Sequence, residues 1–290
     1  MLRTFDGDSR GDFLGQSVSG AGDVNGDGLP DLIVGAVGDD NNGIDSGSAR
    51  IISGAGGGVL YNFNGDVAGD LFGESVSGAG DVNGDGFADL IVGTPLSDSN
   101  GPNSGNVRVF SGANGSILYN FDGDSHGHRL GQSVSGAGDV NNDGLDDLIV
   151  GSSVGNNDAG RGSARVFSGV DGSILYIFTG DATTDSFGFS VSGAGDVNGD
   201  GVADFIVGAR DGNGGGGAFS RGYVRLFVSQ ISAPIILGDC NLDGVVDFLD
   251  ISQFIAVLAS NSFLAQADCN LDGVVDFLDI SAFIAILAGN

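Results

Sequence analysis

The stretch Gly20–Gly35, GAGDVNGDGLPDLIVG, joins an Asp-rich loop to a short apolar run, and it returns three more times along the chain. The later copies begin at Gly78, Gly136 and Gly193, so the spacings are 58, 58 and 57 residues. Self-similarity at a nearly fixed period is typical of one structural unit that is used repeatedly. The sequence therefore predicts a repeat protein with four units in this region.

The first three units each contain four short stretches rich in Val, Ile, Leu and aromatic residues, separated by turns rich in Gly, Asn and Asp, and the fourth unit contains the first three of them. In the first unit these stretches are residues 14–20, 31–35, 48–54 and 59–63. Their length and spacing predict strands, with no helical pattern between them. Four antiparallel strands per repeat are typical of a β-propeller blade. We therefore expect a mainly β protein, a β-propeller of four blades.

The phase of the repeats bears on how the propeller closes. The fourth unit ends after Tyr223–Phe227 and lacks the last strand of the other units, whereas Leu2–Phe5 aligns with the last strand of the first unit, Leu60–Phe63. We expect the N-terminal strand to complete the last blade and close the ring. The alternative is that the four units form an open arc that closes with a second chain.

A second repeat family follows the propeller region. Two near-identical segments begin at Gly238 and Ala267, 29 residues apart, each with an Asp-rich loop and then apolar residues at helical spacing. The expected organisation is a propeller over residues 1–228, a linker over 229–237 and a small α-helical domain over 238–290. The apolar helical positions are Ile251, Phe254, Ile255 and Leu258, and Ile280, Phe283, Ile284 and Leu287.

The Asp-rich loops of the first family have the spacing of a calcium site. Each loop carries oxygen-bearing side chains at positions 1, 3, 5 and 9, a main-chain carbonyl at position 7 and a glycine at position 6 for the sharp turn. An Asx-rich turn without metal is the alternative, but four loops in register favour Ca²⁺. The predicted ligands are Asp23, Asn25, Asp27, Leu29 and Asp31; Asp81, Asn83, Asp85, Phe87 and Asp89; Asp139, Asn141, Asp143, Leu145 and Asp147; and Asp196, Asn198, Asp200, Val202 and Asp204.

The loops of the second family are longer and add a ligand at position 12. They predict two further sites, which brings the expected total to about six calcium ions. The predicted ligands are Asp239, Asn241, Asp243, Val245, Asp247 and Asp250, and Asp268, Asn270, Asp272, Val274, Asp276 and Asp279.

The charge of the chain excludes some partners. The net charge is −28. Of the 38 acidic residues, 37 are Asp, and all ten basic residues are Arg. Such a charge argues against binding to nucleic acids or anionic membranes. No apolar run is long enough to span a bilayer, and the first residues lack the pattern of a secretory signal. We expect an extracellular or cell-surface protein whose export signal is not part of this chain.

Two resemblances extend this interpretation. The first four repeats resemble the FG-GAP repeats of integrin α-chain propellers, with Phe72-Gly73 and Phe187-Gly188 at the front and Leu14-Gly15 and Leu130-Gly131 in the other two units. This resemblance implies extracellular protein interaction or adhesion, with a cell-surface protein or a glycan as the ligand.

The tail resembles a type I-like dockerin, which implies calcium binding and a cohesin-like partner. Phe248-Leu249 and Phe277-Leu278 stand where dockerins often carry small hydroxyl residues that contact cohesin, so the metal sites transfer better than the partner. Cys240 and Cys269 occupy matching loop positions, either as buried thiols or as a bridge between the halves.

Other features have simpler explanations. The tripeptide Arg10-Gly11-Asp12 fills a loop that differs in every unit, and His126 and His128 occur in one copy only. No constellation of catalytic residues breaks the repeat symmetry, so we expect no enzyme. We expect variable loops to bind a partner while the tail attaches the protein to an assembly. The alternative function is a subunit of a secreted polysaccharide-degrading complex. The candidate recognition loops are Gly38–Gly47, Leu96–Gly105, Gly155–Gly162 and Asp211–Gly222.

Overall fold

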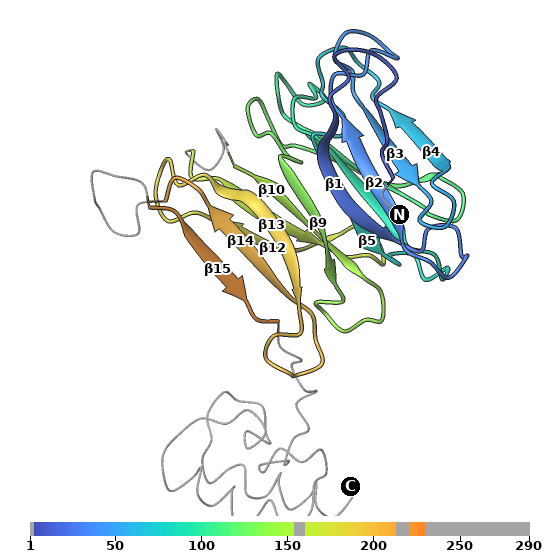
Figure 1. The fold of residues 1–290 in the computed structure, drawn as a ribbon. Coiled ribbons are helices and arrows are strands. Elements are labelled where there is room, and N and C mark those ends of the chain that lie inside the picture. Colours follow the sequence, from blue (N-terminus) through green and yellow to red (C-terminus); the bar gives the residue numbers. More distant parts are fainter. Residues whose placement is uncertain (1–2, 154–159, 213–220, 230–290) are drawn as a thin grey trace, which may run out of the picture. The chain divides into compact units, whose positions relative to one another are not determined.

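The computed structural model describes residues 3–153, 160–212 and 221–229. The chain divides into two units, Met1–Gln230 and Ile231–Asn290, and the described residues all belong to the first. They form four antiparallel sheets and contain no helix (Figure 1). The mainly β prediction for this part of the chain is confirmed.

The four sheets follow the four sequence repeats, and we call them blades 1 to 4. Consecutive strands are neighbours within each sheet. Blade 1 contains β1 (Leu14–Gly22), β2 (Asp31–Ala36), β3 (Ser48–Ile52) and β4 (Val59–Asn64); blade 2 contains β5 (Ser75–Gly80), β6 (Asp89–Thr94), β7 (Asn106–Phe110) and β8 (Ile117–Asp122). Blade 3 contains β9 (Ser133–Gly138), β10 (Asp147–Ser152), β11 (Ser163–Phe167) and β12 (Ile174–Thr179); blade 4 contains β13 (Phe187–Gly195), β14 (Asp204–Ala209) and β15 (Tyr223–Phe227).

Antiparallel pairing fixes where the loops of a blade lie. In blade 1, β1 pairs with β2 and β2 with β3, so the β1–β2 loop and the β2–β3 loop leave the sheet at opposite ends. The Asp-rich loop is the β1–β2 connection, and the candidate recognition loop is the β2–β3 connection. The two kinds of loop therefore occupy opposite rims of the blades.

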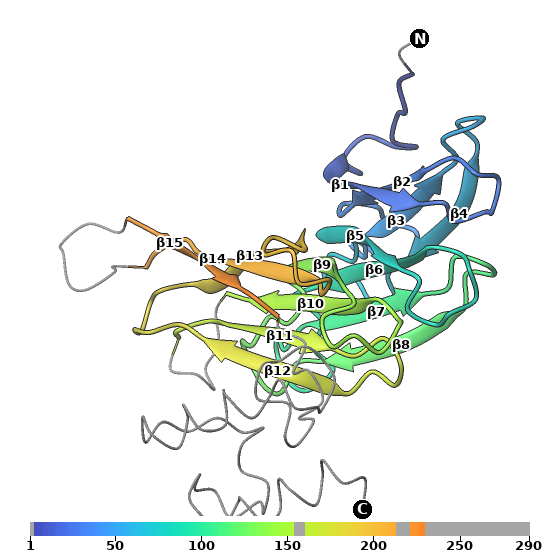
Figure 2. The same cartoon turned by 90° about the horizontal axis from the view of Figure 1, so that it is seen from below.

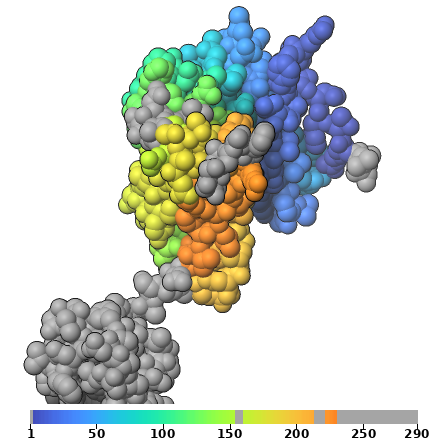
Figure 3. Space-filling view, turned by 90° about the vertical axis from the view of Figure 1, so that its left-hand side faces the viewer, coloured from blue at the N-terminus to red at the C-terminus, as the bar shows by residue number. Residues whose placement is uncertain are grey.

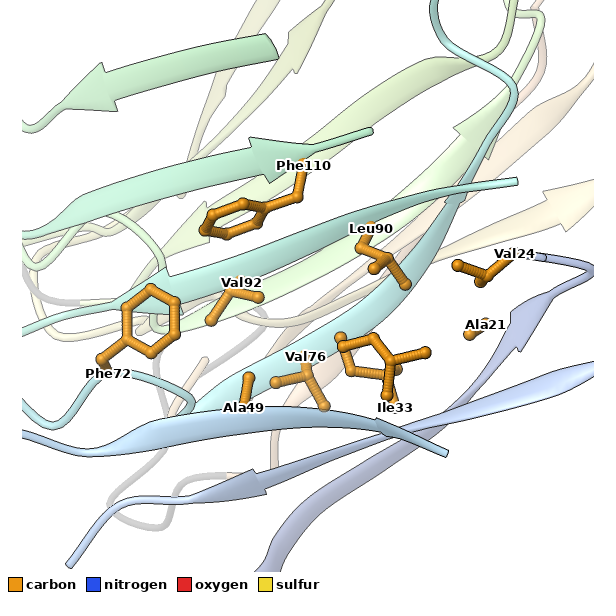
Figure 4. Packing of buried hydrophobic residues seen from close by; sticks show 10 residues of the cluster. Ala21, Val24, Ile33, Ala49, Phe72, Val76, Leu90, Val92 and Phe110 are labelled. Carbon is orange, nitrogen blue, oxygen red and sulfur yellow. The ribbon is translucent and has the colours of Figure 1, made fainter. Parts of the chain in front are cut away.

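The blades pack face to face in chain order. Their first strands are the inner ones, and β1 packs on β5, β5 on β9 and β9 on β13 (Figure 2). At the joint between blades 1 and 2, Ile33 and Ala49 of blade 1 meet Val76 and Leu90 of blade 2 (Figure 4). All four side chains are at most 5% exposed. Removing apolar surface of this kind from water is the main stabilising contribution to each joint.

Aromatic side chains of the outer strands reinforce every joint. The ring of Phe63 in β4 stacks on Phe110 of the next blade with a centroid separation of 4.0 Å. The hydroxyl of Tyr61, two residues earlier, donates to the carbonyl of Gly112. The pairs Phe121–Phe167 and Phe178–Phe227 repeat the contact at 4.1 and 4.0 Å.

Glycine pairs allow neighbouring blades to approach closely. A Cβ on Gly35 of β2 would collide with the carbonyl of Gly73, at the start of blade 2. Gly93 meets Gly131 and Gly151 meets Gly188 in the same way. One glycine of each pair ends the DLIVG run of a blade, and the other follows Phe or Leu at the front of the next repeat. A single backbone contact between blades therefore explains why glycine occurs at both positions.

The predicted closure of the ring is wrong for the described residues. The last sheet has three strands, β13–β14–β15, and the N-terminal segment lies elsewhere. Arg3 donates to the carbonyl of Ala55, in the turn between β3 and β4 of blade 1. The first strands pack in the order β1, β5, β9 and β13, and β1 and β13 lie apart at the two ends of this row (Figure 1). The blades form an open arc.

Candidate metal loops

The four Asp-rich loops have one common hydrogen-bonding pattern. In blade 1 the carboxylate of Asp23 accepts the backbone N–H groups of Asp27 and Gly28, at 3.1 and 2.8 Å. The side-chain oxygen of Asn25 accepts the N–H of Asp27, and that of Asp27 accepts the N–H of Leu29. The loops of blades 2, 3 and 4 repeat these bonds. Positions 1, 3 and 5 are thus held on one short turn.

The glycine at position 6 has the backbone conformation that the sequence predicts. Its φ angle is +84° at Gly28, +87° at Gly86, +95° at Gly144 and +89° at Gly201. A side chain in this left-handed region is strained, so glycine is the favoured residue there.

The aspartate at position 9 is buried and holds the loop to a distant turn. In blade 2, Asp89 is fully buried, and its two carboxylate oxygens accept the N–H groups of Val82 and Gly112 at 3.0 and 2.9 Å. Asp31, Asp147 and Asp204 are equally buried and make the equivalent pairs of bonds. The sequence predicts only a metal ligand at this position, and the structure adds a structural role.

Burial changes the acidity of this position. Desolvation raises the pKa of Asp89 and of Asp147 to about 6, although the two backbone N–H groups at each carboxylate act in the opposite direction. At position 1 of the last loop, hydrogen bonds from the backbone, Gly201 first, lower the pKa of Asp196.

Neighbouring loops are linked across the blade joints. The carbonyl of Asp23, at position 1, accepts the N–H of Ala88 in the loop of blade 2 at 3.1 Å. Asp81 accepts from Asp146, and Asp139 accepts from Ala203. The four loops therefore form one continuous hydrogen-bonded row along their rim.

The donor chemistry of each loop is suited to calcium. Each loop offers three carboxylates and one amide oxygen, which are the hard oxygen ligands that Ca²⁺ takes. Within the described residues, however, no three His, Cys, Asp or Glu side chains lie close enough together to hold a metal ion. The structure brings positions 1, 3 and 5 onto one turn and places position 9 in the interior beneath it.

Several predicted residues lie outside the described part of the chain. These are the twelve ligands from Asp239 to Asp279, together with Cys240 and Cys269. The recognition loops Gly155–Gly162 and Asp211–Gly222 are described only in part.

The Arg10-Gly11-Asp12 tripeptide is part of the scaffold. Asp12 is 6% exposed, and its carboxylate accepts the N–H of Ser9 at 2.7 Å. His128 stands at the equivalent position of blade 3, where it is 2% exposed and its Nδ1 accepts the N–H of Asp124. Both residues close the turn that precedes a blade, which agrees with the interpretation of the tripeptide as loop filling.

The two described recognition loops are built alike. In Gly38–Gly47 the Ser46 hydroxyl donates to the carbonyl of Asp39, and in Leu96–Gly105 that of Ser104 donates to the carbonyl of Ser97. The loops differ in what they expose, for example Ile44 at 74%. The two loops therefore share one hydrogen-bonded frame and differ in the side chains that they expose.

Blade-like sheets that join through their first strands, each with an Asp-rich loop on the same rim, define a repeat protein of the β-propeller type. Comparison with protein families is more specific. The FG-GAP repeat matches residues 72–110, 130–167 and 187–226, and the dockerin type I domain matches residues 237–288. The chain carries FG-GAP repeats followed by a dockerin type I domain, as the sequence predicts, and the family match covers three of the four predicted repeats.

Curated relatives of this chain include integrin α chains. Integrin alpha-5 of Xenopus laevis and integrin alpha-V of Gallus gallus are each 32% identical over 68% of this chain. The chain spans about a fifth of the length of these relatives, 20% in both cases. Among solved structures, rhamnogalacturonan lyase YesW is 20% identical, with a TM-score of 0.43 over 67% of this chain and 40% of the lyase. At that level the likeness supports no inference about activity.

Within the described residues, no helix has the length and the apolar character that crossing a membrane requires.

Proposed function

We propose that this chain is a calcium-binding extracellular protein that acts through protein interaction, with the blades as a recognition scaffold and the tail as an attachment module. The observation that carries the proposal is the regularity of the Asp-rich loops. Four loops have the same ligand types and the same turn. A hydrogen-bonded turn alone does not need three carboxylates in every copy, whereas a divalent cation does.

Calcium would be held by the oxygens at positions 1, 3 and 5, the carbonyl at position 7 and the aspartate at position 9. In blade 1 these are Asp23, Asn25, Asp27, Leu29 and Asp31. The bound ion supplies positive charge that neutralises the clustered carboxylates. Because the carbonyl of Asp23 accepts the N–H of Ala88 in the next loop, ordering one loop also braces the joint to the next blade.

The opposite rim is the proposed recognition surface. The β2–β3 loops there are held by buried serines and expose side chains that differ between blades, such as Ile44 in blade 1. A rigid frame with variable tips lowers the entropic cost of binding a partner. The ligand class that this surface fits is a cell-surface protein or a glycan.

The tail supports a second, separate interaction. Dockerin domains bind cohesin modules, and the matched residues 237–288 cover both Asp-rich loops of the tail. A cohesin-like partner and an extracellular or cell-surface location follow from this proposal. We assign no catalytic role, because each acidic cluster of the blades occurs in every repeat and is accounted for by the loop itself.

Calcium binding is tested by thermal unfolding of the full chain with excess calcium and with a chelator. We expect a sharply higher melting temperature with calcium, since a ligand that binds only the native state stabilises it. Magnesium at the same concentration is the control, and its effect is expected to be smaller. An unchanged melting temperature with calcium would remove the proposal. Binding of a purified type I cohesin module, with and without chelator, tests the tail separately.

A further inference from the structure

The two ends of the arc carry the two halves of a blade joint. We call the outward side of blade 1 the head face and the outward side of blade 4 the tail face. The tail face belongs to the blades and is not part of the C-terminal tail. On the head face Val18 is 67% exposed, although its counterparts Val76, Val134 and Val191 are 5 to 8% exposed inside joints. On the tail face Val224 is 63% exposed, although its counterpart Val107 is fully buried. Each end therefore keeps the apolar residues of a joint without the partner.

Further side chains extend both faces. Leu32 on the head face is 41% exposed, whereas its counterpart Leu90 is fully buried. Leu226 on the tail face is 49% exposed, whereas its counterpart Val109 is fully buried. Figure 3 looks onto the tail end, where the orange residues of β14 and β15 lie at the molecular surface.

The glycine contacts are also left unmatched at the two ends. Gly35, Gly93 and Gly151 each meet the backbone of the following blade, but the nearest atom to a Cβ on Gly208 would be 3.6 Å away. The head-face partner of such a contact, Gly15, has open space around it. Since Gly208 does not have a positive φ, no contact within the described chain requires glycine there.

The N-terminal segment contacts blade 1 in the way that the outer strand of one blade contacts the next blade. Arg3 donates a hydrogen bond to the turn between β3 and β4 of blade 1, and Tyr61 donates the equivalent bond to the turn of blade 2. The glycines of these turns have matching neighbours as well. A Cβ on Gly57 would lie near Arg3 and Phe5, and a Cβ on Gly115 would lie near Tyr61 and Phe63. The segment thus lies beside blade 1 in the place of an outer strand of a preceding blade. Among the described strands, β15 has β14 as its only partner.

We propose that two copies of this chain join head to tail, so that the head face and N-terminal segment of each copy complete blade 4 of the other. The arc leaves β1 and β13 apart, so four blades do not complete the circle. Two copies supply eight blades, which lies within the range of about four to eight in known propellers. By the register of β3 with β4, Val224 of one copy pairs with Phe5 of the other, as Ala49 pairs with Phe63.

One internal contact is missing from this joint. Ala88, Asp146 and Ala203 donate a backbone N–H to the preceding Asp-rich loop, and Pro30 stands at their position in blade 1. Proline has no N–H, so the joint between copies lacks this bond and is weaker than the internal joints. The net charge of −28 also opposes association, and calcium in the loops would reduce it.

The first test is sedimentation of the full chain in calcium, with the variants Val18→Asp and Val224→Asp. Both side chains are exposed in one copy, so the variants fold, and each removes one half of the joint. We expect a dimer for the parent and at least a tenfold weaker dimer for each variant alone. When the two variants are mixed we expect partial recovery, because the unchanged head face of one variant meets the unchanged tail face of the other and forms one intact joint. Val67→Asp, whose side chain is 56% exposed in the loop before β5, is the control and stays dimeric. A monomeric parent, or a dimer that survives both variants, overturns the proposal.

A disulfide identifies the occupant of the tail face. In a background with Cys240 and Cys269 changed to serine, Phe5→Cys and Val224→Cys are combined in one chain and oxidised. A covalent dimer on a non-reducing gel is the expected result, and a cross-link within one chain overturns the proposal in favour of a self-closed ring. Calcium uptake is measured on Val18→Asp and Val224→Asp, which leave every predicted calcium loop unchanged, and is expected to be the same as in the parent. Failure of the joint is therefore distinguishable from failure of the calcium proposal.

Discussion

Asp89 in the Asp-rich loop of blade 2 accepts a hydrogen bond of 2.9 Å from the backbone N–H of Gly112, 23 residues further along the chain. Its other oxygen accepts the N–H of Val82, seven residues earlier. One buried carboxylate therefore ties the loop to the turn between β7 and β8. The same link in each blade means that metal binding in the loop and packing of the blade act on one residue.

The first prediction concerns this link. Asp89→Asn keeps the shape of the side chain but replaces one accepting oxygen by an amide that cannot accept, so one buried N–H loses its partner. We expect a loss of about 2 kcal/mol in the free energy of unfolding without metal, the usual cost of an unsatisfied buried donor. Urea unfolding in chelator measures it. Asp85→Asn, an exposed change in the same loop, is the control; equal losses for both variants would contradict the structural role of Asp89.

The second prediction concerns the exposed end of the same loop. Asp85→Asn removes one ligand charge and keeps an oxygen that can accept the N–H of Phe87. We expect calcium affinity in this loop to fall about tenfold or more, because ligand charge sets affinity in such sites. Calorimetric titration of the full chain with calcium measures the affinities, and we expect one site to be weakened. Asn114→Ala, in an exposed turn of the same blade, serves as control; six unaltered sites in Asp85→Asn would count against this assignment.

The strands of the blades were predictable from the sequence because they depend on local pattern. The DLIVG runs and the Asp-rich turns each carry their own signal within a few residues, and the glycine at position 6 has the predicted left-handed conformation. Repetition of the pattern four times removed the ambiguity that a single short apolar run would have had.

The sequence left a closed ring and an open arc as alternatives and could not choose between them, because the arrangement of neighbouring blades is a property of packing. Alignment of Leu2–Phe5 with outer strands correctly identified the type of contact, since Arg3 occupies the place of Tyr61. It could not tell which blade the segment joins. That depends on how each blade packs on the next, as in the close approach of Gly35 to Gly73.

A repeated ion pair was missed although the sequence held a signal for it. Arg108 in β7 pairs with Asp66, in the turn before β5 of the same blade. Arginine occupies the third position of the third strand in every repeat, and a Gly-Asp dipeptide precedes every blade. Comparison of charges at equal repeat positions would have found the pair. The other three are Arg50–Asp8, Arg165–Asp124 and Arg225–Asp181.

The third prediction concerns pH. Burial first, and then the charge of Asp98, raise the pKa of Asp70 to about 6, so the folded state binds this proton more tightly than the unfolded chain. The contribution of Asp70 to the free energy of unfolding therefore falls as pH rises from about 4 to about 6, and it changes no further above that range. We expect Asp70→Asn to be more stable than the parent at pH 8 and equal to it near pH 3.5.

Thermal unfolding in chelator at the two pH values measures the effect. Asn114→Ala is the control, since Asn114 carries no titratable group and is exposed in the turn between β7 and β8. Its difference from the parent should not change with pH. A difference for Asp70→Asn that is independent of pH would contradict the assigned cause.

The fourth prediction concerns the ion pair of blade 3. Arg165 is 11% exposed at its side chain and Asp124 48%, and the hydrogen bond from the guanidinium lowers the pKa of Asp124. Because solvent screens the half-exposed carboxylate, we expect Arg165→Leu to cost about 1 kcal/mol at pH 7. A lowered pKa gives stability that is present above the unfolded pKa of Asp124 and is lost as pH falls through the folded one, so the cost should shrink below pH 4. Urea unfolding at pH 7 and pH 3 measures it, with Arg221→Leu as an exposed control. A cost that is equal at both pH values would mean that Arg165 acts through packing of its stem and not through its charge.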